Sequence, residues 1–306
     1  MKKISIIVPF LNAEGCIEEC INKLLMQTYE NIEIVLVNDN SVDNSESLIQ
    51  KYLLNEKIKY YKTQKDTIGN AKARNLGIEK CTGDYFIFVD VDDYIDNNLL
   101  ENLSKYIDEG YDLIKYKITF VSENGEEIKK VKGPVFENLT GEEAFNKLCF
   151  EDVLVDSPCV YLIKKEIFIE NDLTFKENTY HEDFGLIPRV ILMAKKVASC
   201  NIYGYFYVQS ENSIMRDEKK SVKKAYDKLS HYDDMAQYLE NFDISKRTKK
   251  NVMIYYTNSL VMSLKDLKDK DYDDFLKELK IRKIHKNIKV RNFKQLIKRI
   301  VFFTKF

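Results

Sequence analysis

Several residue types that define specialised protein classes are missing or rare in this chain. Its 306 residues include no tryptophan, four prolines, ten glycines and three histidines. So little glycine and proline excludes collagen-like and low-complexity proteins, and a hydrophobic content of 44% excludes a disordered chain. The length is sufficient to bury a large core, and it suits one large domain with an appendage. We therefore expect a globular protein that is rich in helix.

Patterns that would place the chain outside the cell or across a membrane are also missing. The six cysteines form no Cys-x-x-Cys pair, and no cysteine–histidine cluster has zinc-site spacing. No apolar run approaches the length that spans a bilayer. The run at residues 4–11 contains Pro9 and passes straight into Asn12, without a signal-peptide cleavage site. We expect a protein with free thiols in the cytoplasm, either soluble or at the inner face of the cell membrane.

Acidic residues are missing from one segment, although the net charge of the whole chain is only −1. Residues 281–306 contain nine lysines and arginines and no aspartate or glutamate. Apolar residues from Phe293 to Val301 recur there at helical spacing. A basic amphipathic helix suits an anionic membrane surface, so we expect peripheral membrane contact through 281–306. The alternative is a helix that packs on the catalytic domain and leaves its basic face in water. No nucleic-acid-binding motif accompanies the charge, so we expect no nucleic-acid partner.

Short apolar runs alternate with helical periodicity over the first hundred residues. The pattern predicts strands at 4–8, 32–37, 58–61 and 85–89, and helices at about 12–27, from Asp43, at 70–80 and from near Asp96. This alternation predicts a mostly parallel sheet covered by helices on both faces. Later segments predict a hairpin at Asn124-Gly125, further strands, and helix alone from about Arg216. We expect a catalytic domain at 1–215 and a helical region at 216–306.

Polar residues follow the predicted strands, where ligands of parallel sheets bind. The fourth strand ends in Asp90, Asp92 and Asp93, and like charges at one strand end repel. A bound divalent cation would offset this repulsion, and carboxylate oxygens are suitable ligands for Mn²⁺ or Mg²⁺. Each motif alone also fits a helix cap, a turn or a surface charge; their joint occurrence disfavours those readings. The candidate site residues at the strand ends are Pro9, Phe10, Leu11, Asn12, Glu14, Asp39, Ser41, Gly69, Asn70, Arg74, Asp90 and Asp92.

Taken together with His181-Glu182-Asp183, these motifs resemble the inverting glycosyltransferase family 2, whose members have the A-type nucleotide-sugar-binding fold. The resemblance covers about residues 3–215. It implies that residues 9–12 and Asp39 hold the nucleobase of a UDP-sugar donor, and that Arg74 and Asp90 contact the nucleotide. It also implies that Asp92 ligates the metal and that Asp183 is the catalytic base. Glu182 is the alternative base, and capping of the next helix is the alternative role for both carboxylates.

This chain departs from the family pattern at two places. Leu11 stands where the family commonly has a tyrosine, and residues 207–213 lack the basic residues that often occur there. Arg216 is either their substitute or an ordinary surface residue. The expected function is metal-dependent, inverting sugar transfer to a saccharide or lipid-linked saccharide in bacterial surface polysaccharide or teichoic acid synthesis. The alternatives are a nucleotidylyltransferase, disfavoured because no glycine-rich loop follows the first strand, and a non-catalytic nucleotide-sugar-binding subunit. A dehydrogenase is disfavoured because GxGxxG is absent there.

Overall fold

The computed structural model describes residues 1–64, 70–151, 155–209 and 220–288. The chain divides into two compact units, Met1–Ser213 and Ile214–Phe306, and each is treated by itself below. Gly69, Arg216 and the tail from residue 289 lie outside the described residues. The expectations that concern them therefore stay predictions.

The first half of the large sheet is parallel, as the alternation predicts. Its strand order is β3-β2-β1-β4, and every neighbouring pair in this part runs in the same direction. All residues of β1 and β2 are buried because helices cover both faces of the sheet. The strands are β1 (Ile4–Phe10), β2 (Ile32–Asn38), β3 (Ile58–Lys62) and β4 (Tyr85–Phe88), and the intervening helices are α1 (Ile17–Leu25), α2 (Ser45–Ile49), η1 (Gln50–Tyr52) and α3 (Ala71–Lys80).

The second half of the sheet contains both parallel and antiparallel strand pairs, so the continuous run of parallel strands ends at β4. Strand β9 (Tyr161–Lys164) is antiparallel to both β4 and β6 (Leu113–Ser122), whereas β10 (Val197–Gln209) is parallel to β6. The carboxyl ends of β6 and β10 therefore lie at the same edge as those of β1 to β4. Short strands β5 (Tyr94–Ile95), β7 (Glu127–Lys130) and β8 (Phe136–Leu139) add antiparallel pairs. The predicted hairpin joins β6 to β7 through Gly125, whose φ is +79°.

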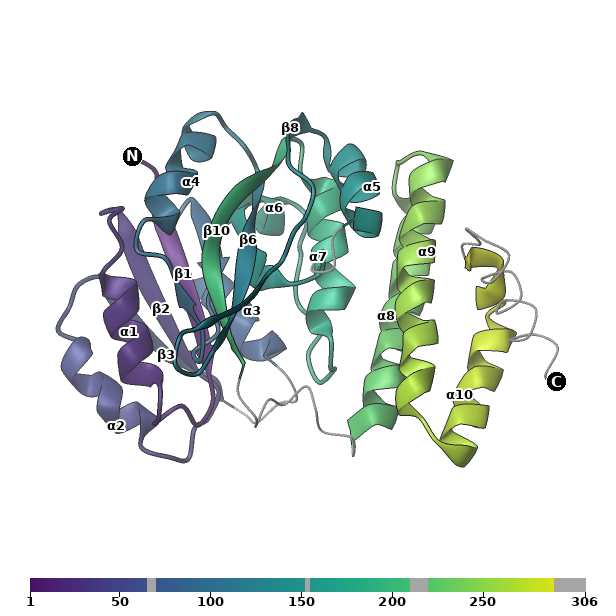
Figure 1. The fold of residues 1–306 in the computed structure, drawn as a ribbon, viewed down its shortest axis with the longest axis horizontal. Coiled ribbons are helices and arrows are strands. Elements are labelled where there is room, and N and C mark those ends of the chain that lie inside the picture. The colour runs from purple at the N-terminus through teal and green to yellow at the C-terminus, as the bar shows by residue number, and fades with distance from the viewer. Residues whose placement is uncertain (65–69, 152–154, 210–219, 289–306) are drawn as a thin grey trace. The chain divides into compact units, whose positions relative to one another are not determined.

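The remaining helices of the first unit follow these strands (Figure 1). Helix α5 begins with a reciprocal cap, in which the Thr140 amide donates to Glu143 and the Glu143 amide donates to Thr140 Oγ1. A Cβ at Gly141 would lie 2.1 Å from the carbonyl oxygen of Ile191, so α5 meets α7 closely. These helices are α4 (Leu99–Asp108), α5 (Gly141–Glu151), η2 (Pro158–Val160), α6 (Glu166–Glu170) and α7 (Glu182–Met193).

Two predicted helix starts are wrong. Asn12 does not cap a helix: its φ is +51°, its amide side chain accepts from the Val42 amide, and α1 begins at Ile17. The helix expected from Asp96 begins at Leu99, because β5 occupies residues 94–95 and extends the preceding segment. At Asn12 a contact with another loop prevails over the local capping preference, whereas Asp96 accepts a local bond from the Asn98 amide.

The second unit is helical throughout its described residues, as expected. It comprises α8 (Ser221–Asn241), α9 (Lys246–Ser263), η5 (Leu264–Asp266), α10 (Asp269–Ile281) and η6 (Ile284–Asn287). Ile284 is fully buried, and Arg282 forms ion pairs with Asp233 and Glu278. The first residues of the predicted basic tail therefore belong to the packed helical unit.

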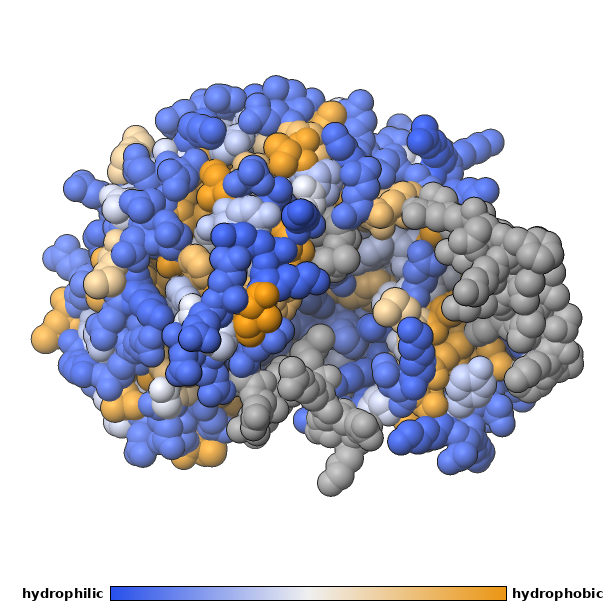
Figure 2. Space-filling model, viewed as in Figure 1, coloured by the Kyte–Doolittle hydropathy of each residue, from blue (hydrophilic) through white to orange (hydrophobic). Residues whose placement is uncertain are grey.

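Neither the face of the molecule in Figure 2 nor any described helix has the apolar character of a membrane-spanning segment. The face shown in Figure 2 is mostly hydrophilic, with hydrophobic residues in small separated groups. Among the described residues, no helix has both the length and the hydrophobicity that crossing a bilayer requires.

Candidate active site

The ends of β1 and β2 position Asp39. The Asp39 amide donates to the Phe10 carbonyl at 2.8 Å, which extends the parallel ladder by one residue. Thr63 Oγ1, just past β3, donates to Asp39 Oδ1 at 2.6 Å. Asp39 is buried, as are Pro9 and Phe10 within β1. Three adjacent strands thus fix this carboxylate at the carboxyl edge of the sheet.

The loops after β1 and β2 brace one another through the predicted polar residues. The Asn12 amide donates to Ser41 Oγ, and the Val42 amide donates to Asn12 Oδ1, both at 2.9 Å. Glu14 Oε2 accepts from the backbone amide and the side chain of Asn44. Leu11, beside them, exposes about half of its surface. Asn12, Glu14 and Ser41 therefore shape this part of the site through loop-to-loop bonds.

Arg74 is the buried centre of an ion-pair network. Helix α3 carries it one turn after Asn70, the residue before the helix, whose carbonyl accepts from the Arg74 amide. Arg74 Nη1 donates to Glu182 at 2.7 Å, and Nη2 donates to Asp90 at 3.3 Å. The Phe88 and Phe175 rings lie 5.6 and 5.7 Å from its guanidinium carbon. Burial disfavours the charge, but the two carboxylates more than offset it and raise the pKa of Arg74 above its ordinary value.

The acidic motif after β4 divides into a structural part and an exposed part. Tyr205 Oη on β10 donates to Asp93 at 2.7 Å and accepts from the Asp90 amide at 3.1 Å. The Val208 amide also donates to Asp93, at 2.8 Å. Burial and the charges of Asp90 and Asp92 raise the pKa of Asp93 to about 8. Asp93 therefore fastens β10 to the motif, while Asp92 is left exposed.

Asp92 is the residue that the sequence predicts as a ligand of a divalent cation. Desolvation by the surrounding atoms and the charge of Asp90 raise the pKa of Asp92. The negative charge of the Asp92 carboxylate is therefore not compensated by a nearby cation among the described residues, and a bound metal ion would stabilise it. Within the ranges that the structure describes, no group of three or more His, Cys, Asp or Glu side chains could hold a metal by itself. Mg²⁺ and Mn²⁺ do not require such a group, because one or two carboxylates with phosphate oxygens and water complete their coordination.

The first turn of α7 carries Glu182 and Asp183, the two candidates for the catalytic base, and gives them different surroundings. His181 precedes the helix with a φ of +59°, and Glu182 and Asp183 form its first turn. Glu182 is buried against Arg74, whereas Asp183 stays partly exposed and accepts from the Phe184 amide at 2.8 Å. Desolvation and the charge of Asp156 raise the pKa of Asp183 to about 6, although Arg74 acts in the opposite direction. A carboxylate with such a pKa can accept a proton near neutral pH.

The structure brings several of the predicted residues together and adds contacts from residues that the sequence did not indicate. Arg74, Asp90 and Glu182 meet directly, as residues of one site should. Tyr205, Phe175 and Cys159 were not anticipated; Cys159 Sγ donates to Asp90 Oδ2 at 3.5 Å. The only sequence signal for Tyr205 is its place in the predicted strand 203–208. A single sequence gives no sign that it contacts Asp93, 112 residues earlier.

Comparison with known proteins identifies the family to which the chain belongs. The fold is that of the A-type glycosyltransferases, which the solved structures of TarS share. Residues 5–171 match the profile described as Glycosyl transferase family 2, and the chain belongs to that family. It is a glycosyltransferase.

Relatives and solved structures agree with this assignment. The chain is 32% identical to glycosyltransferase GlyG of Streptococcus pneumoniae serotype 4 over 70% of its own length and 73% of that protein. It is 24% identical to the poly(ribitol-phosphate) beta-N-acetylglucosaminyltransferase TarS of Staphylococcus aureus over 84% of its length, which is only 44% of TarS. The crystal structure of TarS 1–349 in complex with UDP-GlcNAc has a TM-score of 0.75 at 20% identity, over 94% of this chain and 82% of that one.

Proposed function

We propose that this protein is an inverting glycosyltransferase that moves a sugar from a UDP-sugar to an acceptor hydroxyl. The observation that carries the proposal is the Arg74 network. It ties the end of β4, where Asp90 lies, to the first turn of α7, where Asp183 is partly exposed. A donor contact and a proton acceptor are thereby fixed in one rigid arrangement, which is what a displacement between two bound substrates requires.

The donor is assigned to the edge formed by β1, β2 and β4. Asp39, Arg74 and Asp90 all lie there, with Asp39 positioned for a nucleobase and Arg74 supplying a permanent positive charge. TarS, which shares the fold, has been solved with UDP and with UDP-GlcNAc. We place Pro9, Asn12, Ser41, Gly69 and Asn70 around the same donor, in line with the family motifs.

The proposed reaction is a single displacement. Asp183, ionised above about pH 6, takes the proton of the acceptor hydroxyl. The hydroxyl oxygen then attacks the anomeric carbon from the face opposite the diphosphate, which inverts the configuration. Glu182 is engaged by Arg74 and holds α7 in place, so Asp183 is our choice of base. A Mn²⁺ or Mg²⁺ ion at Asp92, when bound, would neutralise charge on the departing diphosphate.

The cellular setting is proposed from the relatives and from the charge pattern. TarS acts on poly(ribitol-phosphate), and GlyG is another bacterial glycosyltransferase. We infer a saccharide or lipid-linked saccharide acceptor in surface polysaccharide or teichoic acid synthesis, at the cytoplasmic face of the cell membrane. Residues 289–306, with six lysines and arginines and no acidic residue, are the proposed membrane contact.

A binding panel followed by product analysis tests the proposal. Thermal unfolding is measured with UDP-, GDP- and dTDP-sugars, with and without Mn²⁺, because a ligand of the folded state raises the melting temperature. The sugar nucleotide that binds is then supplied with candidate acceptors, and the anomeric configuration of the product is read by NMR. We expect a Mn²⁺-dependent shift with a UDP-sugar and an inverted linkage. A retained configuration would refute the mechanism, and binding without transfer to any acceptor would favour a non-catalytic subunit.

A further inference from the structure

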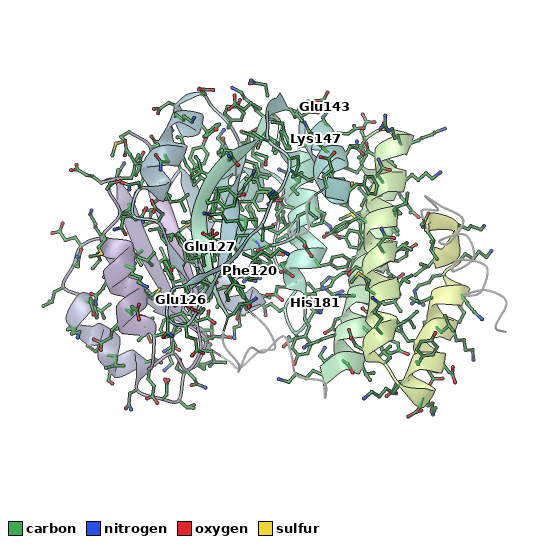
Figure 3. All side chains as sticks on the ribbon, in the orientation of Figure 1. Phe120, Glu126, Glu127, Glu143, Lys147 and His181 are labelled. Atoms are coloured by element: carbon green, nitrogen blue, oxygen red, sulfur yellow. The ribbon has the colours of Figure 1, made fainter. Side chains whose placement is uncertain are left out.

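Two aromatic rings contact each other on β6 and β10, the strand whose residues Tyr205 and Val208 bind Asp93. Phe120 on β6 and Tyr207 on β10 are direct partners in the parallel ladder. Their ring centroids lie 5.1 Å apart, with the ring planes tilted by 60°. Neither ring is fully buried, so each keeps part of its surface open to solvent. Phe120 is labelled in Figure 3 together with Glu126 and Glu127 of the adjoining hairpin.

This aromatic pair lies on the same face of the sheet as the acidic motif. Side chains two apart on a strand share a face, so Tyr207 points to the side on which Tyr205 reaches Asp93. Two residues of strand span about 6.6 Å, which places Tyr207 one step closer to the carboxyl edge. The next amide, that of Val208, is itself bonded to Asp93. Phe206 faces the other way, where it stacks on Tyr94 at 4.7 Å.

The aromatic pair lies too far from the base-binding end to serve the nucleotide. The strand order from Asp39 to Phe120 is β2-β1-β4-β9-β6, which is four strand spacings, or about 19 Å. The acidic motif lies between the two positions. A donor whose nucleobase is at Asp39 and whose diphosphate is at Asp90 and Asp92 would point its sugar toward the β6 and β10 side. The pair therefore belongs to the acceptor half of the site.

We propose that Phe120 and Tyr207 form a stacking platform for a pyranose ring of the acceptor, an assignment that rests on the proposed glycosyltransferase function. The axial C–H groups of a sugar form an apolar face with slight positive charge, and the face of an aromatic ring carries negative charge. The hydroxyl rim of the sugar needs polar partners. Lys129 on β7 is the direct partner of Phe120 and is exposed, and Glu126 and Glu127 in the same hairpin are exposed as well. Apolar rings with a polar rim suit a saccharide better than a lipid.

Binding of simple sugars tests the platform without requiring turnover. The probes are methyl β-glycosides of glucose, galactose and N-acetylglucosamine, with ribitol 5-phosphate as a polyol that has no ring. Saturation-transfer NMR on the UDP-loaded protein reports which protons of the probe touch it. We expect contact through the C–H face of the glycosides and weak or no contact with ribitol 5-phosphate. Tyr207→Ala should weaken glycoside binding on the order of tenfold, and Tyr207→Phe should keep it, because stacking does not use the hydroxyl.

Phe206→Ala is the matched control, since it removes a ring from the same strand on the opposite face. It should leave glycoside binding unchanged. Equal binding by wild type and Tyr207→Ala would overturn the platform, and so would glycoside binding that Phe206→Ala weakens equally. Tyr207-dependent binding of cholesterol sulfate without any glycoside binding would overturn the saccharide assignment. UDP binding is measured in the same samples: if UDP binds and no glycoside does, only the platform fails, whereas loss of UDP binding in wild type contradicts the proposed function itself.

Discussion

Glu182 and Asp183 are neighbours in the sequence, but the fold gives their carboxylates different partners. Glu182 is buried and bonded to Arg74, while Asp183 keeps part of its surface open and accepts only a short local bond from the Phe184 amide among the bonds described for it. Glu182 is held in its ion pair, and protonation would remove one of the two carboxylates that compensate the buried guanidinium, although burial raises the pKa of Glu182 as well. The geometry therefore favours Asp183 as the base and gives Glu182 a positioning role.

The first prediction distinguishes the positioning role of Glu182 from the catalytic role of Asp183 by the free energy of unfolding of two variants. Glu182→Gln keeps the shape of the side chain but removes one of the two anions that compensate buried Arg74. We expect a loss of about 2 kcal/mol in the free energy of unfolding, measured by urea denaturation at pH 7. Asp183→Asn is the control and should be unchanged or more stable, because desolvation disfavours the ionised carboxylate that it replaces. Equal midpoints for Glu182→Gln and wild type would show that the ion pair adds no stability.

The second prediction concerns the metal. Asp92 is exposed, but desolvation by the surrounding atoms and the neighbouring charge of Asp90 disfavour its ionised form unless a cation binds. Asp92→Asn should therefore remove the Mn²⁺-dependent part of the UDP affinity, a decrease on the order of tenfold or more, without loss of folding. Calorimetry of UDP with and without Mn²⁺ measures it. Asp108→Asn removes one exposed negative charge from α4 of the same unit and should change nothing. Metal-dependent affinity that survives in Asp92→Asn contradicts the assignment.

At the residue scale, the sequence indicates which polar residues gather at the edge of the sheet but not the bonds between them. Polar residues that follow buried strands must gather at one edge of a parallel sheet, so Asp39, Arg74 and Asp90 could be predicted. The pairing of Arg74 with Glu182 joins residues 108 apart, and nothing local to either residue indicates it. The role of Tyr205 cannot be predicted from the sequence either. A residue in a strand shows the same alternating pattern whether its side chain contacts the core or the active site.

At the element scale, the position of Arg74 depends on how closely α3 approaches β1. Gly77 lies one turn after Arg74 in α3, and a Cβ there would come within 2.3 Å of Ile7 Cγ2. Ile7 is fully buried and has no room to move away. The absence of a side chain at residue 77 therefore lets the helix that carries Arg74 seat against the sheet.

The third prediction follows from that contact. Gly77→Ala should destabilise the protein by about 1–3 kcal/mol through overpacking, and it should weaken UDP binding because α3 is displaced together with Arg74. Gly15→Ala is the matched control, since a Cβ there would have nothing within 4 Å. Thermal unfolding and UDP calorimetry on both variants make the comparison. A Gly77→Ala protein as stable and as active in UDP binding as Gly15→Ala would contradict this account of the helix.

The elements themselves were predicted where periodicity is strong. The parallel strands follow the expected ranges closely, since continuous apolar runs depend on burial that the sequence records. Helix α3 also follows its expected range, although its apolar residues do not gather on one face. Helix starts were less predictable. Asn12 has the chemistry of a cap, but Ser41 and Val42 engage it from another loop. The pattern predicts a strand near Val160, but the antiparallel position of β9 between β4 and β6 could not be foreseen, because strand order depends on contacts between distant segments.

At the scale of the whole molecule, the basic tail is shorter than the sequence suggests. Ile284 is buried in the helical unit, and Asn287 donates to Tyr232 Oη at 3.2 Å. Removing residues from 281 onward would therefore damage packing as well as charge. A deletion that begins at 289 avoids this problem and still removes six of the nine basic residues.

The fourth prediction uses that deletion. The protein without residues 289–306 should keep its UDP affinity and melting temperature but bind phosphatidylglycerol vesicles more weakly, because each basic residue near an anionic surface contributes about 1 kcal/mol. Co-sedimentation at low and high salt measures it, with phosphatidylcholine vesicles as the neutral control. If the shortened protein binds vesicles as well as the full chain, the tail is not the membrane contact. If it melts earlier, the segment contributes to packing.

The central claim is that Asp183 is the base of a sugar-transfer reaction. Its most direct test is the turnover of Asp183→Asn against wild type over pH 5 to 9, with the sugar nucleotide that the binding panel identifies and with its affinity measured in parallel. We expect turnover to fall by about two to four orders of magnitude with donor affinity retained. Wild-type turnover should fall as pH drops below about 6, because a protonated carboxyl cannot accept a proton, and the variant should lack this dependence. Full turnover in Asp183→Asn would contradict the account.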